Sequence, residues 1–296
     1  MKLIFKFLMC FTLTNCFCTN EAALIAPETN AIEIVSLADG VKKVTIGFDN
    51  ENHPIKIAYR AKGVNDGRPV VVFSDIYFGM RGWDCQMEEL SEKFYVIAFD
   101  SVGYGLSTKN HPEDLDGVGG ETGYSFRQQA VFLNKFLKKL NPHGPITYVG
   151  CDIQGQSGMW YTIMFANDPL KIEKLALIDT APAGIVGDDP CLPVFLNSAT
   201  AAFLAESYSN TTDPTKGPCN TLCLILGESF LTIDCPEIGP VLKQQSVNYL
   251  AQTPADIYTR VVTQTFAENI AGLMEQITIP VTYYYGGAGD VTPISR

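Results

Sequence analysis

The chain lacks the excess of positive charge that proteins binding nucleic acids or anionic membranes usually carry. Its 296 residues contain 21 Lys and Arg against 32 Asp and Glu, which gives a formal net charge of −11 at pH 7. A surface of this sign repels phosphate backbones and anionic lipid headgroups. We therefore expect neither nucleic acid nor an anionic membrane surface as a partner, and we interpret the negative charge as a contribution to solubility.

Long apolar runs are also scarce. Only the first residues, MKLIFKFLMCFTLTNCFC, combine two lysines, an apolar stretch and small residues before Thr19. This pattern predicts a signal peptide over residues 1–18, and a buried N-terminal helix is the alternative. Beyond it no run approaches the roughly 18 consecutive apolar residues of a membrane-spanning helix. We therefore expect a secreted or periplasmic protein whose mature chain has no membrane span.

Cysteine is more abundant, with nine residues in the chain. Four of them cluster in a loop-rich stretch: Cys191, Cys219, Cys223 and Cys235. In an exported protein such a cluster predicts two disulfides, of open connectivity. A zinc site is the weaker alternative because no histidine lies nearby, so we expect no metal and no other cofactor. Cys85 and Cys151 are expected to be buried thiols.

Apolar runs alternate with helical patterns from residue 41 onward. Near-continuous apolar runs occupy residues 69–74, 94–100, 146–152, 174–179 and 279–286, and KVTIGF and IKIAYR precede them as a pair of early strands. Such runs are typical of strands that crossover helices bury on both faces. The sequence therefore predicts an α/β fold with a doubly wound, mostly parallel sheet flanked by helices.

Two helical segments and one insertion complete this organisation. Ser125 is the expected N-cap of the amphipathic run FRQQAVFLNKFLKKL, and Pro169 is expected to close the helix that follows residue 152. Residues 183–275 break the alternation of strands and helices. We expect them to form a helical cap over the carboxyl edge of the sheet, inserted between core segments 19–182 and 276–296.

These motifs, in this order, resemble the α/β-hydrolase fold family. The segment VVVFSDIYFGMRGWDCQMEELSEKFYVIAFDSVGYGLS is similar to the family's strand, oxyanion loop, helix and following strand. KIEKLALIDTAP is similar to its next strand, and IPVTYYYGGAGDVTP to the strand that delivers the catalytic acid. The resemblance covers about residues 45–182 and 276–293, and it implies a hydrolase that takes a small apolar molecule under its cap.

The stretch ITYVGCDIQGQSGMWYT runs from a predicted strand into a glycine-rich turn, without the Gly-x-Ser-x-Gly frame of many hydrolases. With Asp152 as nucleophile it resembles the Gly-x-Asp-x-x-Gly turn of epoxide hydrolases and haloalkane dehalogenases, although Gln154 is bulky for that turn. A carboxylate there would attack an epoxide or alkyl-halide carbon to give an ester, which water then opens. Two other registers stay open: Gly155 at the turn, with no nucleophile, or Ser157 as nucleophile.

The resemblance also implies the other site residues. Asp290, in a Gly-Ala-Gly-Asp segment, matches the acid that orients the general base. The backbone N–H groups of Ile76 and Ile153 match the oxyanion-hole donors, which stabilise negative charge in the transition state. Ser74 and Asp75 stand where the family usually has His-Gly.

Histidine is the scarcest of the residues that this chemistry needs. The chain has three, His53, His111 and His143, and none follows Asp290 as the family's general base does. His53 and His143 are expected in surface turns, which leaves His111 as a minor candidate. Two interpretations follow: an epoxide hydrolase-like enzyme whose given sequence stops before its base, or a catalytically inactive α/β-hydrolase-like protein that binds or interacts.

Overall fold

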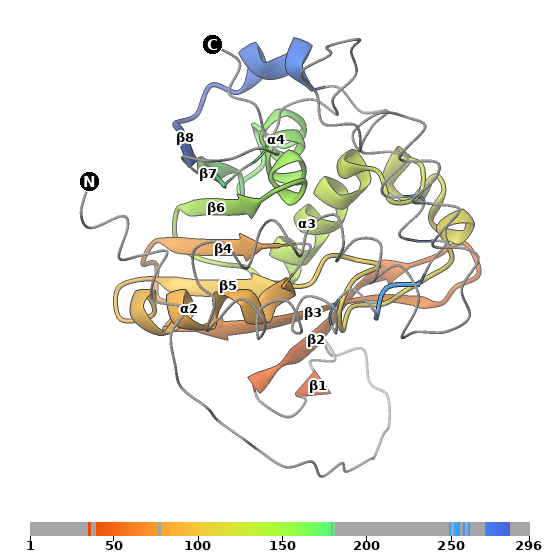
Figure 1. The fold of residues 1–296 in the computed structure, drawn as a ribbon, viewed down its shortest axis with the longest axis horizontal. Coiled ribbons are helices and arrows are strands. Elements are labelled where there is room, and N and C mark those ends of the chain that lie inside the picture. The colour runs from red at the N-terminus through yellow and green to blue at the C-terminus, as the bar shows by residue number, and fades with distance from the viewer. Residues whose placement is uncertain are drawn as a thin grey trace, which may run out of the picture.

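The described strands form one mixed sheet of eight strands in the order β1-β2-β3-β5-β4-β6-β7-β8 (Figure 1). The computed structural model describes residues 35–36, 40–75, 78–178, 180, 249, 252–254, 257, 260 and 270–284. The strands are β1 (Val35–Ser36), β2 (Lys42–Phe48), β3 (Pro54–Lys62), β4 (Val70–Ser74), β5 (Tyr95–Phe99), β6 (Ile146–Cys151), β7 (Ile172–Ile178) and β8 (Val281–Tyr284).

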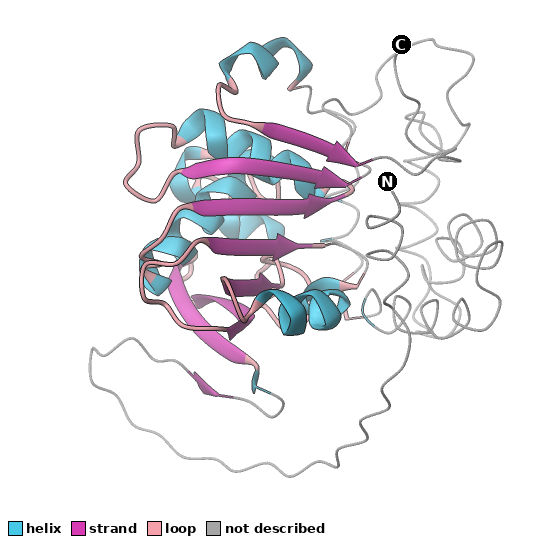
Figure 2. Cartoon of the chain, turned by 90° about the vertical axis from the view of Figure 1, so that its left-hand side faces the viewer, coloured by secondary structure: helices cyan, strands magenta, loops and turns pink. Residues whose placement is uncertain are grey.

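Strand direction divides the sheet into two parts. The β1–β2, β2–β3 and β3–β5 pairs are antiparallel. The strands β5, β4, β6, β7 and β8 run parallel to one another, so their carboxyl ends meet at one edge (Figure 2). This arrangement confirms the predicted mostly parallel sheet, and side chains that follow these strands gather at that edge.

Helices cover both faces of the sheet. The α-helices are α2 (Asp84–Leu90), α3 (Phe126–Leu140) and α4 (Gln154–Met164), and the short 3-10 helices are η2 (Gly79–Trp83), η3 (Pro112–Leu115), η4 (Val118–Gly120) and η6 (Ala271–Gln276). Side chains of α3 and α4 pack into the larger core on one face, and those of η2 and α2 into a smaller core on the other. The predicted doubly wound arrangement is therefore confirmed.

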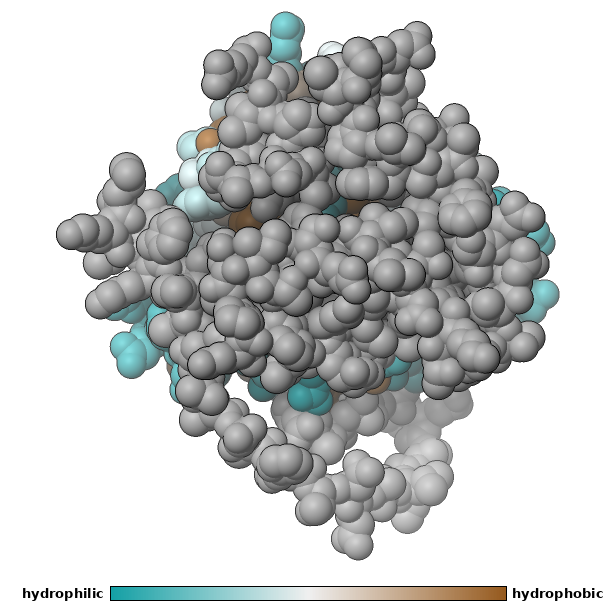
Figure 3. Space-filling model, in the orientation of Figure 1, coloured by the Kyte–Doolittle hydropathy of each residue, from teal (hydrophilic) through white to brown (hydrophobic). Residues whose placement is uncertain are grey.

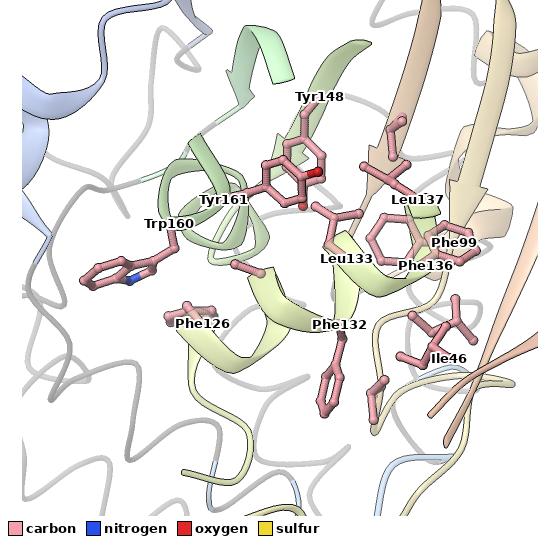
Figure 4. Close-up of a cluster of buried hydrophobic side chains, with 14 of the residues drawn as sticks. Ile46, Phe99, Phe126, Phe132, Leu133, Phe136, Leu137, Tyr148, Trp160 and Tyr161 are labelled. Carbon is pink, nitrogen blue, oxygen red and sulfur yellow. The ribbon is translucent and has the colours of Figure 1, made fainter. Parts of the chain in front are cut away.

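Helix α3 shows why the larger core forms where it does. The Ser125 hydroxyl accepts the Gln128 N–H at 3.0 Å, so the predicted N-cap is confirmed. The helix then presents an apolar face to the sheet and to α4 (Figure 4). Ring contacts extend this packing, since Phe136 lies 5.3 Å from Phe99 and 5.4 Å from Tyr59 between ring centroids.

Two expectations from the sequence are wrong. Helix α4 ends at Met164 rather than beside Pro169. Between the two the chain forms a turn, in which the Asp168 N–H donates to the Phe165 carbonyl. Cys85 is exposed on α2 instead of buried, because this short helix buries only Met87 against the sheet. Cys151 is half-buried at the end of β6.

The described surface has few large apolar side chains. At the rim of the face shown in Figure 3, most of the coloured residues are hydrophilic, and the hydrophobic areas are small. Within the described segments, no helix has the length and apolarity needed to cross a bilayer. The predicted signal peptide 1–18, the four clustered cysteines, Ile76, Asp290 and most of the predicted cap lie outside the described residues.

Candidate active site

Asp152 occupies the turn between the end of β6 and the start of α4, with a half-buried side chain. Its φ of +51° lies in the left-handed region, which only two other described non-glycine residues enter, Asn52 and Asn141. A non-glycine residue there carries backbone strain, and strain of this kind concentrates at functional sites. A strained strand-to-helix turn that exposes one side chain is the geometry of a nucleophile elbow.

The backbone of Asp152 is hydrogen-bonded on both sides of this strained residue. Its N–H donates to the Ile178 carbonyl at 2.8 Å, across to the neighbouring strand. Its carbonyl accepts the Gly155 N–H at 3.0 Å and the Thr180 hydroxyl at 2.9 Å. These bonds fix the peptide planes on both sides of Asp152.

Glycine is required at two positions beside this turn. A β-carbon on Gly150 would lie 2.5 Å from the Gly155 α-carbon, and one on Gly155 would lie 2.2 Å from the Thr180 hydroxyl oxygen. Both distances are too short for non-bonded atoms. The Gly150 and Gly155 that flank Asp152 in the sequence are therefore needed for the close approach of strand and helix.

The alternative registers of the turn do not fit this geometry. Gly155 and Ser157 both lie within α4 rather than at the turn. The Ser157 side chain is buried, with its oxygen 3.4 Å from the Gln154 side-chain oxygen. The residue with the left-handed φ at the strand-to-helix turn is therefore Asp152.

Gln154, bulky for this position, is accommodated by small hydroxyl side chains. Its side-chain oxygen accepts the Ser101 hydroxyl at 3.1 Å, and the Ser74 hydroxyl lies 3.5 Å away. Its backbone carbonyl accepts the Tyr148 hydroxyl at 3.0 Å. Ser74 ends β4 and Ser101 follows β5, so Gln154 joins the ends of two strands to the first turn of α4.

A second polar cluster surrounds the fully buried carboxylate of Asp100. One oxygen accepts the Met80 N–H at 2.9 Å and the Tyr249 hydroxyl at 3.2 Å, and the other accepts the Leu106 N–H at 2.9 Å. Burial raises the pKa of Asp100, which these donors partly offset. Asp100 thus links the loops after β4 and β5 to a residue 149 positions later in the chain.

Tyr249 reaches Asp100 through a slot between two glycines. A β-carbon on Gly79 would lie 2.2 Å from the Tyr249 ring, and one on Gly105 would lie 2.5 Å from it. Both glycines have positive φ, +60° and +48°. Burial raises the pKa of the Tyr249 phenol, and the charges of Asp100 and Asp75 add to the shift.

The loop that replaces the family's His-Gly turns Asp75 back onto its own backbone. The carboxylate is buried and accepts the Phe78 N–H at 2.9 Å. Ile76 lies outside the described residues. Ile153 caps α4, and within the described segments its N–H has no hydrogen-bond acceptor, which is what an oxyanion donor requires.

The three histidines lie on the surface rather than at the turn. His53 and His143 are exposed in the turns that precede β3 and β6, as the sequence predicts. His111 is also exposed, 4.0 Å from the Glu113 carboxylate, so the structure does not support it as a base. Asp290 lies outside the described residues.

Sequence reasoning missed Thr180 and Tyr249 as parts of this region. Thr180 is a polar residue directly after the apolar β7, and its placement at the carboxyl edge is the signal that could have found it. Tyr249 has no local signal, because its contact with Asp100 is formed only by the tertiary fold.

Comparison with known proteins identifies the family of this fold. The family described as alpha/beta hydrolase fold matches residues 69–231, which is more than half of the chain. Among curated proteins, a cis-3-alkyl-4-alkyloxetan-2-one decarboxylase of Xanthomonas campestris pv. campestris is 25% identical over 136 residues. That match covers 46% of this chain and 44% of the relative, so this chain aligns with less than half of the relative's length.

Solved structures show the same fold at low sequence identity. A hydrolase from Pseudomonas aeruginosa has a TM-score of 0.62 at 17% identity, covering 90% of this chain and 84% of its own. A bromoperoxidase from Bacillus anthracis has a TM-score of 0.63 at 20% identity, covering 83% and 82%. The epoxide hydrolase CorEH has a TM-score of 0.58 at 18% identity, also covering 83% and 82%. With its sheet order and its family match, the chain belongs to the α/β-hydrolase fold family.

Proposed function

We propose that this protein is a hydrolase that opens the epoxide of a small apolar molecule, with the Asp152 carboxylate as nucleophile. The observation that carries the proposal is the left-handed φ of +51° at Asp152, between β6 and α4. In this fold the nucleophile occupies that turn, and here the occupant is a carboxylate. A carboxylate nucleophile is suited to attack on the saturated carbon of an epoxide, whereas a serine hydroxyl is suited to acyl transfer.

The proposed chemistry has two steps. A lone pair of an Asp152 carboxylate oxygen forms a bond to one ring carbon, and the bond from that carbon to the epoxide oxygen breaks. The released alkoxide takes up a proton, which leaves a hydroxyalkyl ester on Asp152. Water then adds to the ester carbonyl, the bond from this carbon to the diol oxygen breaks, and the diol and the free carboxylate are released with one proton, which balances the proton taken up by the alkoxide.

The remaining roles complete the proposal. The N–H groups of Ile153 and Ile76 stabilise the oxyanion that forms when water adds to the ester. Asp290 orients the base that activates this water. We place the substrate beneath residues 183–275 and the protein outside the cytoplasm, as its N-terminal pattern suggests.

The comparisons support a strained ring as the substrate, without fixing which ring. The epoxide hydrolase CorEH shares the fold, and the name of the Xanthomonas relative describes action on oxetan-2-ones, which are four-membered cyclic esters. Strain weakens the ring bond to oxygen in both classes. A β-lactone is therefore the second probe to use.

Covalent capture tests the proposal. Purified protein is mixed with 1,2-epoxyhexane or a β-lactone and quenched in acid within the first turnover, before water opens the ester, and intact mass and peptide mapping then locate the adduct. We expect one probe mass on the peptide that contains Asp152, and no adduct in Asp152→Asn. Asn is the matched control because it also tolerates a left-handed φ but carries no nucleophilic oxygen charge.

Ser157→Ala separates the elbow from the neighbouring hydroxyl, and it should be labelled as the wild type is. Labelling of the wild type at Ser157, or equal labelling of Asp152→Asn, would contradict the assignment. If neither probe reacts while both bind, the inactive binding protein becomes the better description.

A further inference from the structure

We propose that Thr180 is a positioning residue that holds Asp152 in its reactive conformation through a hydrogen bond to the Asp152 carbonyl. This inference rests on the proposed nucleophilic role of Asp152. Thr180 lies two residues beyond the end of β7, the strand next to β6, and its side chain is fully buried. It does not itself contact the reacting atoms.

The direction of this hydrogen bond follows from its surroundings. The Thr180 hydroxyl oxygen lies 2.9 Å from the Asp152 carbonyl, 3.3 Å from the Ile178 carbonyl and 3.5 Å from the Gly150 carbonyl. All three are acceptors, so the hydroxyl can only donate. The shortest distance and the normal length of an O–H···O bond select Asp152 as its partner.

The rotamer of Thr180 is restricted by the helix beside it. A β-carbon on Gly155 would lie 2.2 Å from the Thr180 oxygen and 2.4 Å from its methyl carbon, so the side chain packs directly on Gly155. A β-branched side chain is stiff at χ1. The missing side chain at Gly155 therefore leaves the space that the hydroxyl needs to reach the carbonyl of Asp152.

The hydrogen bond opposes the natural relaxation of the turn. A left-handed Asp can release strain by rotating its flanking peptides, and such a rotation moves its carbonyl oxygen. The Thr180 hydroxyl and the Gly155 N–H both hold that oxygen in place. Because small displacements of a reacting group lower its rate strongly, loss of the hydroxyl is expected to slow attack by Asp152.

Three variants test this inference. Thr180→Val keeps the shape and removes the hydroxyl, whereas Thr180→Ser keeps the hydroxyl. Thr162→Val is the matched control, because Thr162 is also buried and donates to the carbonyl of Met159 at 2.8 Å without contacting the turn. Each variant is assayed for the rate of single-turnover labelling by 1,2-epoxyhexane across probe concentrations, and for amide hydrogen exchange of the peptide that contains residues 152–156.

We expect Thr180→Val to lower the limiting labelling rate about tenfold with an unchanged half-saturating probe concentration, as loss of one buried hydrogen bond suggests. Faster exchange of the turn peptide should accompany this loss. Thr180→Ser and Thr162→Val should match the wild type in both measurements. Because Thr162→Val also removes a buried hydroxyl, a general loss of stability would slow it as much as Thr180→Val.

The proposal is overturned if Thr180→Val labels and exchanges as Thr162→Val does, or if Thr180→Ser is as slow as Thr180→Val. A wild type that forms neither the adduct nor the diol product refutes the nucleophilic role of Asp152 instead. Hydrogen exchange then still decides whether Thr180 holds the turn, so the two failures are distinguishable.

Discussion

Replacing Gln154 with methionine tests whether the hydroxyl network behind the elbow stabilises the fold. Methionine has nearly the same shape and length, so the change removes the amide without opening a large cavity. The buried Ser101 hydroxyl loses its acceptor at 3.1 Å. Ser74 and Ser157, also buried, lose weaker contacts at 3.5 Å and 3.4 Å.

The geometry sets the size of the effect. One well-formed hydrogen bond contributes about 1 kcal/mol, and a buried donor left without an acceptor costs about 1–3 kcal/mol more. The Ser74 and Ser101 oxygens lie 3.5 Å apart and can partly satisfy each other, which favours the lower end of that range. We expect Gln154→Met to lower the free energy of unfolding by about 2 kcal/mol.

Equilibrium urea unfolding, followed by far-UV circular dichroism, measures this difference through the transition midpoint. Gln128→Met is the matched control. Gln128 is fully buried on α3, and within the described segments neither polar atom of its side chain has a hydrogen-bond partner. Its replacement should cost nothing or stabilise the protein. The reasoning is refuted if Gln154→Met is as stable as the wild type, or if Gln128→Met loses as much.

Three further changes have expected outcomes. Gly155→Ala should destabilise by about 1–2 kcal/mol in urea unfolding, because its β-carbon would overlap Thr180, whereas Gly272→Ala, with open space around it, should not. Ser125→Ala should cost about 1 kcal/mol through the lost cap of α3, and a loss no greater than that of Gly272→Ala would contradict the cap. Because burial raises the pKa of Asp100 above its value in the unfolded chain, protonation favours the fold, so its contribution to stability grows as pH falls through the folded pKa and is lost as pH rises. Unfolding midpoints should therefore show the wild type gaining stability relative to Asp100→Asn as pH falls from neutral toward the ordinary pKa of an aspartate, and a difference that stays constant with pH would oppose this.

The sheet could be predicted because its physical signal is local. Strands covered on both faces need apolar side chains on both sides, so runs such as residues 69–74 and 94–100 are nearly continuous in apolar residues. Helix α3 was equally accessible, because its cap residue Ser125 and its apolar face are both encoded within about 16 positions. Each of these signals is complete within one segment of chain.

The register of the elbow could not be read in the same way. In enzymes that this chain resembles, a proline usually ends the helix at a fixed spacing after the nucleophile, and applying that spacing to Pro169 favours Gly155. This reasoning assumes that the helix extends to the proline. Helix α4 ends at Met164, and two turns follow before β7. Sequence alone does not fix how many residues such turns take, whereas the positive φ of Asp152 identifies the turn directly.

The insertion of Tyr249 between Gly79 and Gly105 constrains which substitutions this sequence can accept during evolution. A β-carbon at either glycine would overlap both the tyrosine ring and the Asp100 carboxylate. A smaller residue at 249 would leave that carboxylate with one donor fewer. No one of the four positions can therefore vary alone without loss, and relatives that differ at one of them should differ at others too. Such linked variation would appear as covariation between segments about 150 residues apart, which local sequence comparison does not detect.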